Sequence, residues 1–134
     1  MIVVTDGGDT TSSLKYKDAL AELHRSDAVL YAILVVPIAN NAGRNLGGEH
    51  ALETLTKASG GTVFTPSDAT GLDQAFASIL RDLRTQYLIG YYPRNTPLLS
   101  NRFHQVRVDP PRTGLQVQTR TGYYGGSEES ASGR

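Results

Sequence analysis

The feature that constrains the fold most is an uncharged apolar run from Ala28 to Val36, which ends at Pro37. The run is rich in β-branched residues and shows no alternation of polar and apolar positions. Such a run is typical of a strand that is covered on both faces, as in a parallel sheet flanked by helices. The sequence therefore predicts an α/β protein in which this segment is the central strand.

Shorter patterns on both sides of this run complete an alternation of strands and helices. We expect strands at Ile2–Thr5 and Thr62–Thr65, and helices at Ser12 or Ser13 to Arg25, Glu49 to Ser59, and Thr70 through Leu83. Ser12 or Ser13 can cap the first helix, and Gly60-Gly61 is a typical left-handed exit from the second. Thr70 and Asp73 have the spacing of a capping box for the third helix.

The pattern changes after the third helix to alternating residues separated by turns that contain proline or glycine. This predicts an antiparallel meander with strands at Tyr87–Tyr92, Phe103–Asp109 and Leu115–Arg120. We thus expect residues 1–86 to form the α/β unit and residues 87–124 to extend the same sheet. Residues 125–134 contain only Gly, Ser, Ala, Glu and Arg, which predicts a disordered tail.

Composition narrows the classes of function. The chain has 134 residues, the size of one domain, with 13 basic and 13 acidic side chains. No basic block is present, which argues against a nucleic-acid partner. The absence of cysteine excludes disulfides, zinc–thiolate sites and thiol catalysis. No apolar run approaches the ~20 residues that cross a bilayer, so we expect no membrane span in this chain.

The strongest candidate site is the loop that follows the first strand. Its proposed ligand-binding residues are Asp6, Gly7, Gly8, Asp9, Thr10 and Ser12. Ligands of open α/β sheets bind at the carboxyl ends of strands, and oxygen-only ligand sets suit Mg²⁺ or Ca²⁺. Turn chemistry is the other interpretation, because Asp and Gly supply turn dihedrals and the hydroxyl groups can cap a helix. The residues alone leave both interpretations open.

Other residues that could carry chemistry are scattered. The three histidines, His24, His50 and His104, lack metal-ligand spacing, so we expect each at the surface or packed. The late tyrosines could bind sugars or peptides, but strand packing with the hydroxyl groups at the rim is favoured. These tyrosines are Tyr87, Tyr91, Tyr92, Tyr123 and Tyr124.

Several segments, taken in order, match a known family. They are Ile2 to Ser13, Tyr31 to Ile33, Ala58 to Phe64, Ile79 to Pro93, Val106 to Val108 and Arg120 to Tyr124. In this order and spacing the chain resembles the C-terminal half of a von Willebrand factor type A domain. More narrowly, it resembles the "VWFA-related" domain family of acidobacterial proteins.

The resemblance implies a three-layer, Rossmann-like sheet that is incomplete on its N-terminal side. Many type A domains bind Mg²⁺ at an adhesion site built from three loops, and Asp6-Gly7 matches the third. The family's Asp there often reaches the metal through water, and the other two loops would lie before Met1. The resemblance therefore allows Mg²⁺ in the full-length protein, with Asp6 as an outer-shell ligand, and implies weak or no binding in this chain.

The resemblance also implies a non-catalytic, adhesion-type scaffold module that binds a protein partner and is exported to the periplasm or cell envelope. In a complete type A domain the strand matching Ile2–Thr5 lies in the middle of the sheet. We therefore expect this chain to associate through that edge, as a homodimer or by exchange of elements. The alternative function is a metal-dependent hydrolase or phosphotransfer enzyme that uses Asp6 and Asp9.

Overall fold

The computed structural model describes residues 1–8, 13–36, 45–94 and 102–125. In these segments the chain is an α/β protein with three helices, a three-stranded parallel sheet and a two-stranded antiparallel sheet. The parallel sheet consists of β1 (Ile2–Thr5), β2 (Tyr31–Leu34) and β3 (Val63–Phe64), in the order β1-β2-β3. The predicted α/β class is confirmed at this level.

β2 is the central strand, as the apolar run predicts, and all four of its residues are buried. It is shorter than that run because its neighbour β1 is short. The pairing begins where the Tyr31 N–H donates to the Met1 carbonyl, and the Val35 N–H makes the last bond, to Thr5. The length of β1 therefore limits the paired part of β2.

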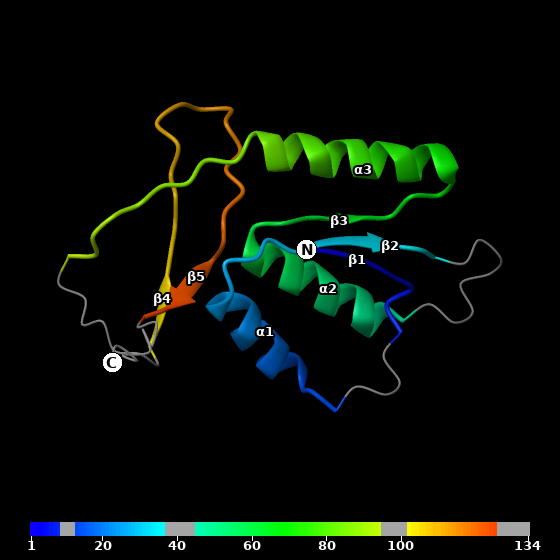
Figure 1. Ribbon diagram of the computed structural model, residues 1–134, viewed down its shortest axis with the longest axis horizontal. Helices are drawn as coiled ribbons and strands as arrows, with labels where there is room; N and C mark the ends of the chain where they lie inside the picture. The colour runs from blue at the N-terminus through cyan, green and yellow to red at the C-terminus, as the bar shows by residue number, and fades with distance from the viewer. Residues whose placement is uncertain (9–12, 37–44, 95–101, 126–134) are drawn as a thin grey trace, which may run out of the picture.

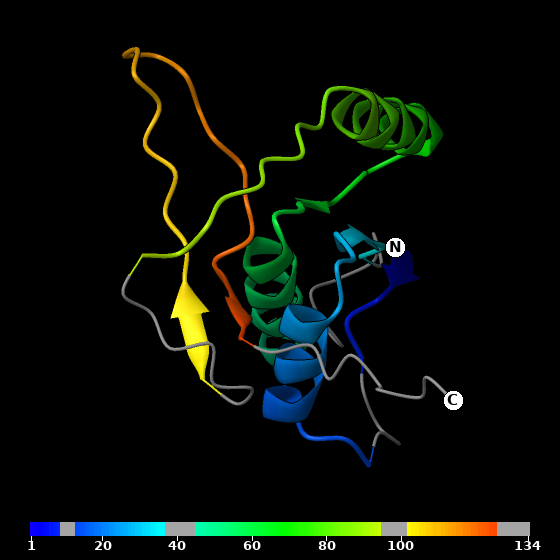
Figure 2. The same ribbon diagram turned by 60° about the vertical axis from the view of Figure 1, so that its left-hand side comes forward.

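Helices cover both faces of the parallel sheet (Figures 1 and 2). α1 (Tyr16–Arg25) and α2 (Leu46–Ser59) lie on one face, and α3 (Ala69–Arg84) lies on the other. Under α3, its residue Ile79 is 1% exposed and forms the buried core with Tyr31 and Ile33 of β2. None of the helices in the described segments is long and apolar enough to cross a membrane.

The first helix begins later than predicted. Lys15 is the N-cap of α1, with extended backbone angles and no side-chain capping bond. The prediction that Ser12 or Ser13 caps this helix is therefore wrong. Ser13 is exposed and precedes the helix, and Ser12 lies outside the described residues. Leu14 lies in a bend, Lys15 is extended, and the Lys15 carbonyl accepts the first bonds of the helix.

The other two helices begin earlier than predicted because polar side chains upstream act as their caps. The Asn45 side chain accepts from the Gly48 N–H at 3.0 Å, so α2 starts at Leu46. The Asp68 carboxylate accepts from the Gly71 N–H at 2.7 Å, so Asp68 rather than Thr70 caps α3. These are typical N-cap contacts. At the other end of α2, Gly60 has φ +83°, which confirms the predicted left-handed exit.

The predicted three-stranded meander that extends the sheet is wrong. The later described residues form β4 (Phe103–Gln105) and β5 (Gly122–Tyr124), an antiparallel pair in a separate sheet. We call this pair the ribbon. Residues 87–92 and 115–120 contain no strand, and Tyr87 and Leu88 are 91% and 103% exposed. Residues 126–134, most of the predicted disordered tail, lie outside the described residues.

The ribbon is separate because the chain before β5 binds the ends of the helices rather than a strand edge. The Thr121 N–H donates to the Ala58 carbonyl at 3.0 Å, at the end of α2. The Arg120 guanidinium donates to the His24 carbonyl at 2.7 Å, at the end of α1, and to the Asp27 carboxylate at 2.8 Å. The bonds to Ala58 and His24 use carbonyl groups that a helix leaves unpaired at its C-terminus. They position the ribbon across the ends of α1 and α2.

Candidate functional site

The candidate ligand loop after β1 begins as a tight turn. The Gly8 N–H donates to Asp6 Oδ1 at 2.9 Å, and the Gly7 N–H donates to the Thr5 hydroxyl at 3.1 Å. Side chains of Asp and Thr commonly stabilise turns through such bonds. Gly7 has φ +81°, a conformation that favours glycine. Asp6 and Gly7 thus have the hydrogen bonds and the dihedral angle of a turn, and the prediction of a ligand loop stays a prediction.

The start of α2 lies directly against this turn. A Cβ atom on Gly48 would lie 1.8 Å from the Gly7 carbonyl oxygen, so the two backbones are in contact. Leu34, at the end of β2, is also close, with its Cδ1 atom 3.4 Å from a Cβ placed on Gly7. The loop is thus at the carboxyl ends of β1 and β2, the position where ligands bind in open α/β sheets.

The structure describes Asp6, Gly7 and Gly8 of the predicted ligand loop, whereas Asp9, Thr10 and Ser12 lie outside the described residues. Asp6 is exposed. The described residues contain no group of three or more His, Cys, Asp or Glu side chains arranged to hold a metal ion. Mg²⁺ requires near-octahedral oxygen geometry. In the described part of the loop, Asp6 offers one carboxylate, and one of its oxygen atoms already accepts from Gly8.

We expect Mg²⁺ to bind this chain weakly or not at all, because a single exposed carboxylate supplies too few ligands. Titration calorimetry should detect no saturable Mg²⁺ binding in the micromolar range. Asp6→Asn is the matched variant, because its amide oxygen can still accept from the Gly8 N–H. Micromolar affinity in the wild type that is lost in Asp6→Asn would contradict this expectation.

The second candidate site is the outer edge of β1, which has β2 as its neighbour in the three-stranded sheet. The carbonyl groups of Met1 and Thr5 accept bonds from β2. Backbone groups alternate in direction along a strand, so those of Ile2 and Val4 point away from β2. Among the described residues no strand pairs with this edge of β1, and the expectation of an open edge at Ile2–Thr5 agrees with that strand order.

One face of β1 is also uncovered. Ile2 is in register with Tyr31, and Val4 is in register with Ile33. Residues in register share a face of the sheet, so these four side chains point toward the α3 side. Tyr31 and Ile33 are 2% and 0% exposed, whereas Ile2 and Val4 are 43% and 58% exposed. α3 therefore covers β2 and leaves β1 bare.

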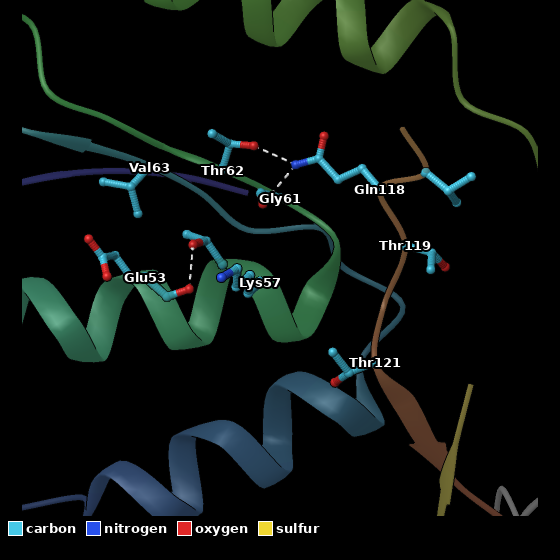
Figure 3. Close-up of a pocket in the computed structure, with 10 residues that line it drawn as sticks. Glu53, Lys57, Gly61, Thr62, Val63, Gln118, Thr119 and Thr121 are labelled. Carbon is cyan, nitrogen blue, oxygen red and sulfur yellow. Dashed lines mark hydrogen bonds between the residues drawn. The ribbon is translucent and has the colours of Figure 1, made fainter. Parts of the chain in front are cut away.

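An open groove of about 700 Å³ lies at the other end of α2 (Figure 3). It is lined by Glu53, Thr56, Lys57, Gly61, Thr62, Val63, Val117, Gln118, Thr119 and Thr121. The Gln118 amide spans it and donates to the Gly61 carbonyl at 2.8 Å and to the Thr62 hydroxyl. Sequence reasoning missed this groove, because one wall comes from residues 117–121, a segment that alternates like a strand.

The histidines and tyrosines occupy different environments. His24 is 7% exposed between α1 and the ribbon, the His50 side chain is exposed on α2, and His104 of β4 stacks on Tyr123. A hydrogen bond with Tyr123 raises the pKa of Tyr91. The predicted strand packing is wrong for Tyr87 and Tyr92, which are 91% and 96% exposed because residues 87–92 form no strand.

The described geometry thus contains a turn with one carboxylate, a bare strand edge and a polar groove. Comparisons of the chain with models of known protein families, with curated proteins and with solved structures found no match.

Proposed function

We propose that this chain is a non-catalytic protein-binding module that accepts a strand of its partner at the edge of β1. The observation that carries the proposal is the contrast between two neighbouring strands. β2 is buried, whereas β1 has exposed Ile2 and Val4 side chains and, in the segments that the structure describes, an outer edge that pairs with no strand. We call this outer edge and the side chains of Ile2 and Val4 the β1 surface.

Strand addition fits the β1 surface because an added strand contacts both the backbone groups and the exposed side chains of Ile2 and Val4. Backbone hydrogen bonds from an added strand give affinity, and alternate side chains give specificity. Ile2 and Val4 are such alternate side chains, and full burial of an aliphatic side chain contributes about 1.5–3 kcal/mol. An unpaired apolar edge is otherwise prone to nonspecific pairing. A partner strand would remove both the exposed edge and the exposed apolar face.

The resemblance to the C-terminal half of a von Willebrand factor type A domain supports the same proposal. We infer a Rossmann-like sheet in which a further strand lies beside β1. A second copy of this chain, or a protein partner, supplies that strand. In the full-length, exported protein, Mg²⁺ near Asp6 would then bridge to an acidic group of a bound protein. The alternative proposal, an enzyme that uses Asp6 and Asp9, depends on Asp9, which lies outside the described residues.

The substitution Val4→Lys tests the proposal. We expect the wild-type chain to self-associate with increasing concentration, and Val4→Lys to weaken this association at least about tenfold, because it places a charge on the strand-accepting face. Leu115→Lys is the matched control, since Leu115 is also 58% exposed but lies far from β1 along the chain. Sedimentation velocity measures both. A wild-type chain that stays monomeric at its highest soluble concentration, or equal losses in the two variants, would contradict the proposal.

A further inference from the structure

We propose that the contact between the ribbon and α1 is a pH-dependent latch, which is closed while His24 is neutral and opens when His24 is protonated. This inference is independent of the β1 surface. It rests on the position of His24 at the end of α1, where the aromatic side chains of the ribbon pack.

His24 is the centre of an aromatic cluster that joins the ribbon to α1. Its ring centroid lies 4.7 Å from that of Phe103 in β4 and 6.4 Å from that of Tyr124 in β5. Phe103 and Tyr124 contact each other edge to face, with centroids 5.4 Å apart. Arg25 lies over the Tyr124 ring at 4.9 Å, a cation–π contact on the rim of the cluster. The imidazole therefore packs as an aromatic side chain between two elements.

The two ring nitrogens of His24 have different environments. The ring forms a hydrogen bond with the Gly122 backbone, whereas Nδ1 is buried and has no hydrogen-bond partner. A neutral imidazole carries one N–H group, whereas the imidazolium carries an N–H group on both nitrogens, Nδ1 included. A charged imidazolium would bury an N–H group at Nδ1 without an acceptor, which is unfavourable.

The charges around the cluster also disfavour protonation. Ionisable groups on the surrounding elements include Glu22, Arg25 and Asp27 at the end of α1, Lys57 at the end of α2, Arg102 and His104 beside or in β4, and Arg120, Tyr123 and Tyr124 beside or in β5. The Asp27 side chain is 96% exposed and pairs with Arg120. Burial is the main cause that lowers the pKa of His24, the positive charge of Arg120 lowers it further, and the bond to Gly122 opposes both.

The direction of the His24 pKa shift determines that the latch opens at low pH rather than at high pH. The pKa of His24 is lowered below 6.5 in the closed state, so the open state binds more protons. The latch is therefore fully stable above about pH 6.5 and loses stability as the pH falls through the pKa of the closed state. In that window the equilibrium constant for opening rises by up to about tenfold per pH unit.

Amide hydrogen exchange of the wild-type chain measures the latch directly. The Thr121 N–H donates to the Ala58 carbonyl across the junction, and the Val35 N–H donates to the Thr5 carbonyl at the end of the β1–β2 pairing, away from the ribbon. After correction for intrinsic exchange rates, we expect the protection of Thr121 to fall from about pH 7.5 to about pH 5, by at most about tenfold per pH unit. The protection of Val35 should stay constant. A constant protection of Thr121, or an equal loss at Val35, would overturn the proposal.

Two variants assign the effect to His24. His24→Phe keeps the aromatic contacts and removes the titratable group, so the protection of Thr121 should become independent of pH. His104→Phe is the matched control, because His104 is also a ribbon histidine with an unpartnered buried nitrogen, and it should keep the pH dependence. Loss of the pH dependence in His104→Phe, or its persistence in His24→Phe, would overturn the proposal. If His24→Phe does not fold, an NMR titration of the wild-type ring decides, and a His24 pKa of 6.5 or above rejects the latch.

Discussion

Gly48→Ala is expected to destabilise the chain by about 3 kcal/mol, because the new methyl group would collide with backbone. The Cβ atom would lie 1.8 Å from the Gly7 carbonyl oxygen and 2.8 Å from the Gly7 carbonyl carbon. A flexible side chain could move away from such a contact, but the backbone carbonyl of the buried Gly7 cannot. The start of α2 would have to shift away from the turn after β1. Chemical denaturation measures the change in the free energy of unfolding.

The neighbouring residue provides the control. Gly47 is also in the first turn of α2, yet the nearest atom to a Cβ placed there is Asn45 Oδ1, at an ordinary 3.4 Å. Gly47→Ala should therefore be neutral or stabilise the chain by up to about 1 kcal/mol, the usual gain when alanine replaces glycine in a helix. Equal effects of the two substitutions would show that the close contact between Gly48 and Gly7 is absent in solution.

Ile79→Ala is expected to lower the free energy of unfolding by about 3 kcal/mol. Ile79 is 1% exposed and is the residue of α3 that packs against Tyr31 and Ile33 of β2. The substitution removes three carbon atoms and leaves a cavity between α3 and the sheet. The chain loses the free energy of burying those atoms and their van der Waals contacts with the sheet. Ile79→Val, which removes one carbon atom, should cost about 1 kcal/mol.

Leu80→Ala is the control for this prediction, because Leu80 follows Ile79 directly in α3 but is 53% exposed. It should cost less than about 1 kcal/mol. Thermal or urea unfolding of the three variants measures the series. A loss in Leu80→Ala as large as that in Ile79→Ala would show that the helix is rotated relative to the sheet.

The sequence predicts the α/β part of the fold well because local patterns there agree with the tertiary structure. The run from Ala28 to Val36 is apolar enough that burial between two layers is the favourable outcome, and helical periodicity identifies the three helices. Helix starts are less predictable, because several polar residues near each start can act as the cap. Asn45 and Asp68 reach the free N–H groups at the starts of α2 and α3, whereas Thr70 lies within the first turn of α3.

The ribbon and the candidate sites depend on contacts between residues that are distant in the sequence. The local alternation of polar and apolar residues does not encode such contacts. The bond from Arg120 to the His24 carbonyl joins residues 96 positions apart, and it directs the chain to the helix ends. The sequence pattern predicts the turn at Asp6, whereas the open edge of β1 is what the family resemblance implies. The sequence contains no local signal for the contact of Gly48 with Gly7 or for the burial of His24, because each requires a partner from another element.

The segment of Arg120 and Thr121, which binds the C-terminal ends of α1 and α2, also affects the order of folding during synthesis. Both helices leave the ribosome while Arg120 and Thr121, which bind their last carbonyl groups, are still untranslated. Until then water must solvate those carbonyl groups, and the two nascent helices lack their final restraint. Stable packing of the ribbon against α1 and α2 is therefore expected only after these residues have been translated. A translational pause before them would prolong an intermediate in which the two helices are not yet fixed by the ribbon.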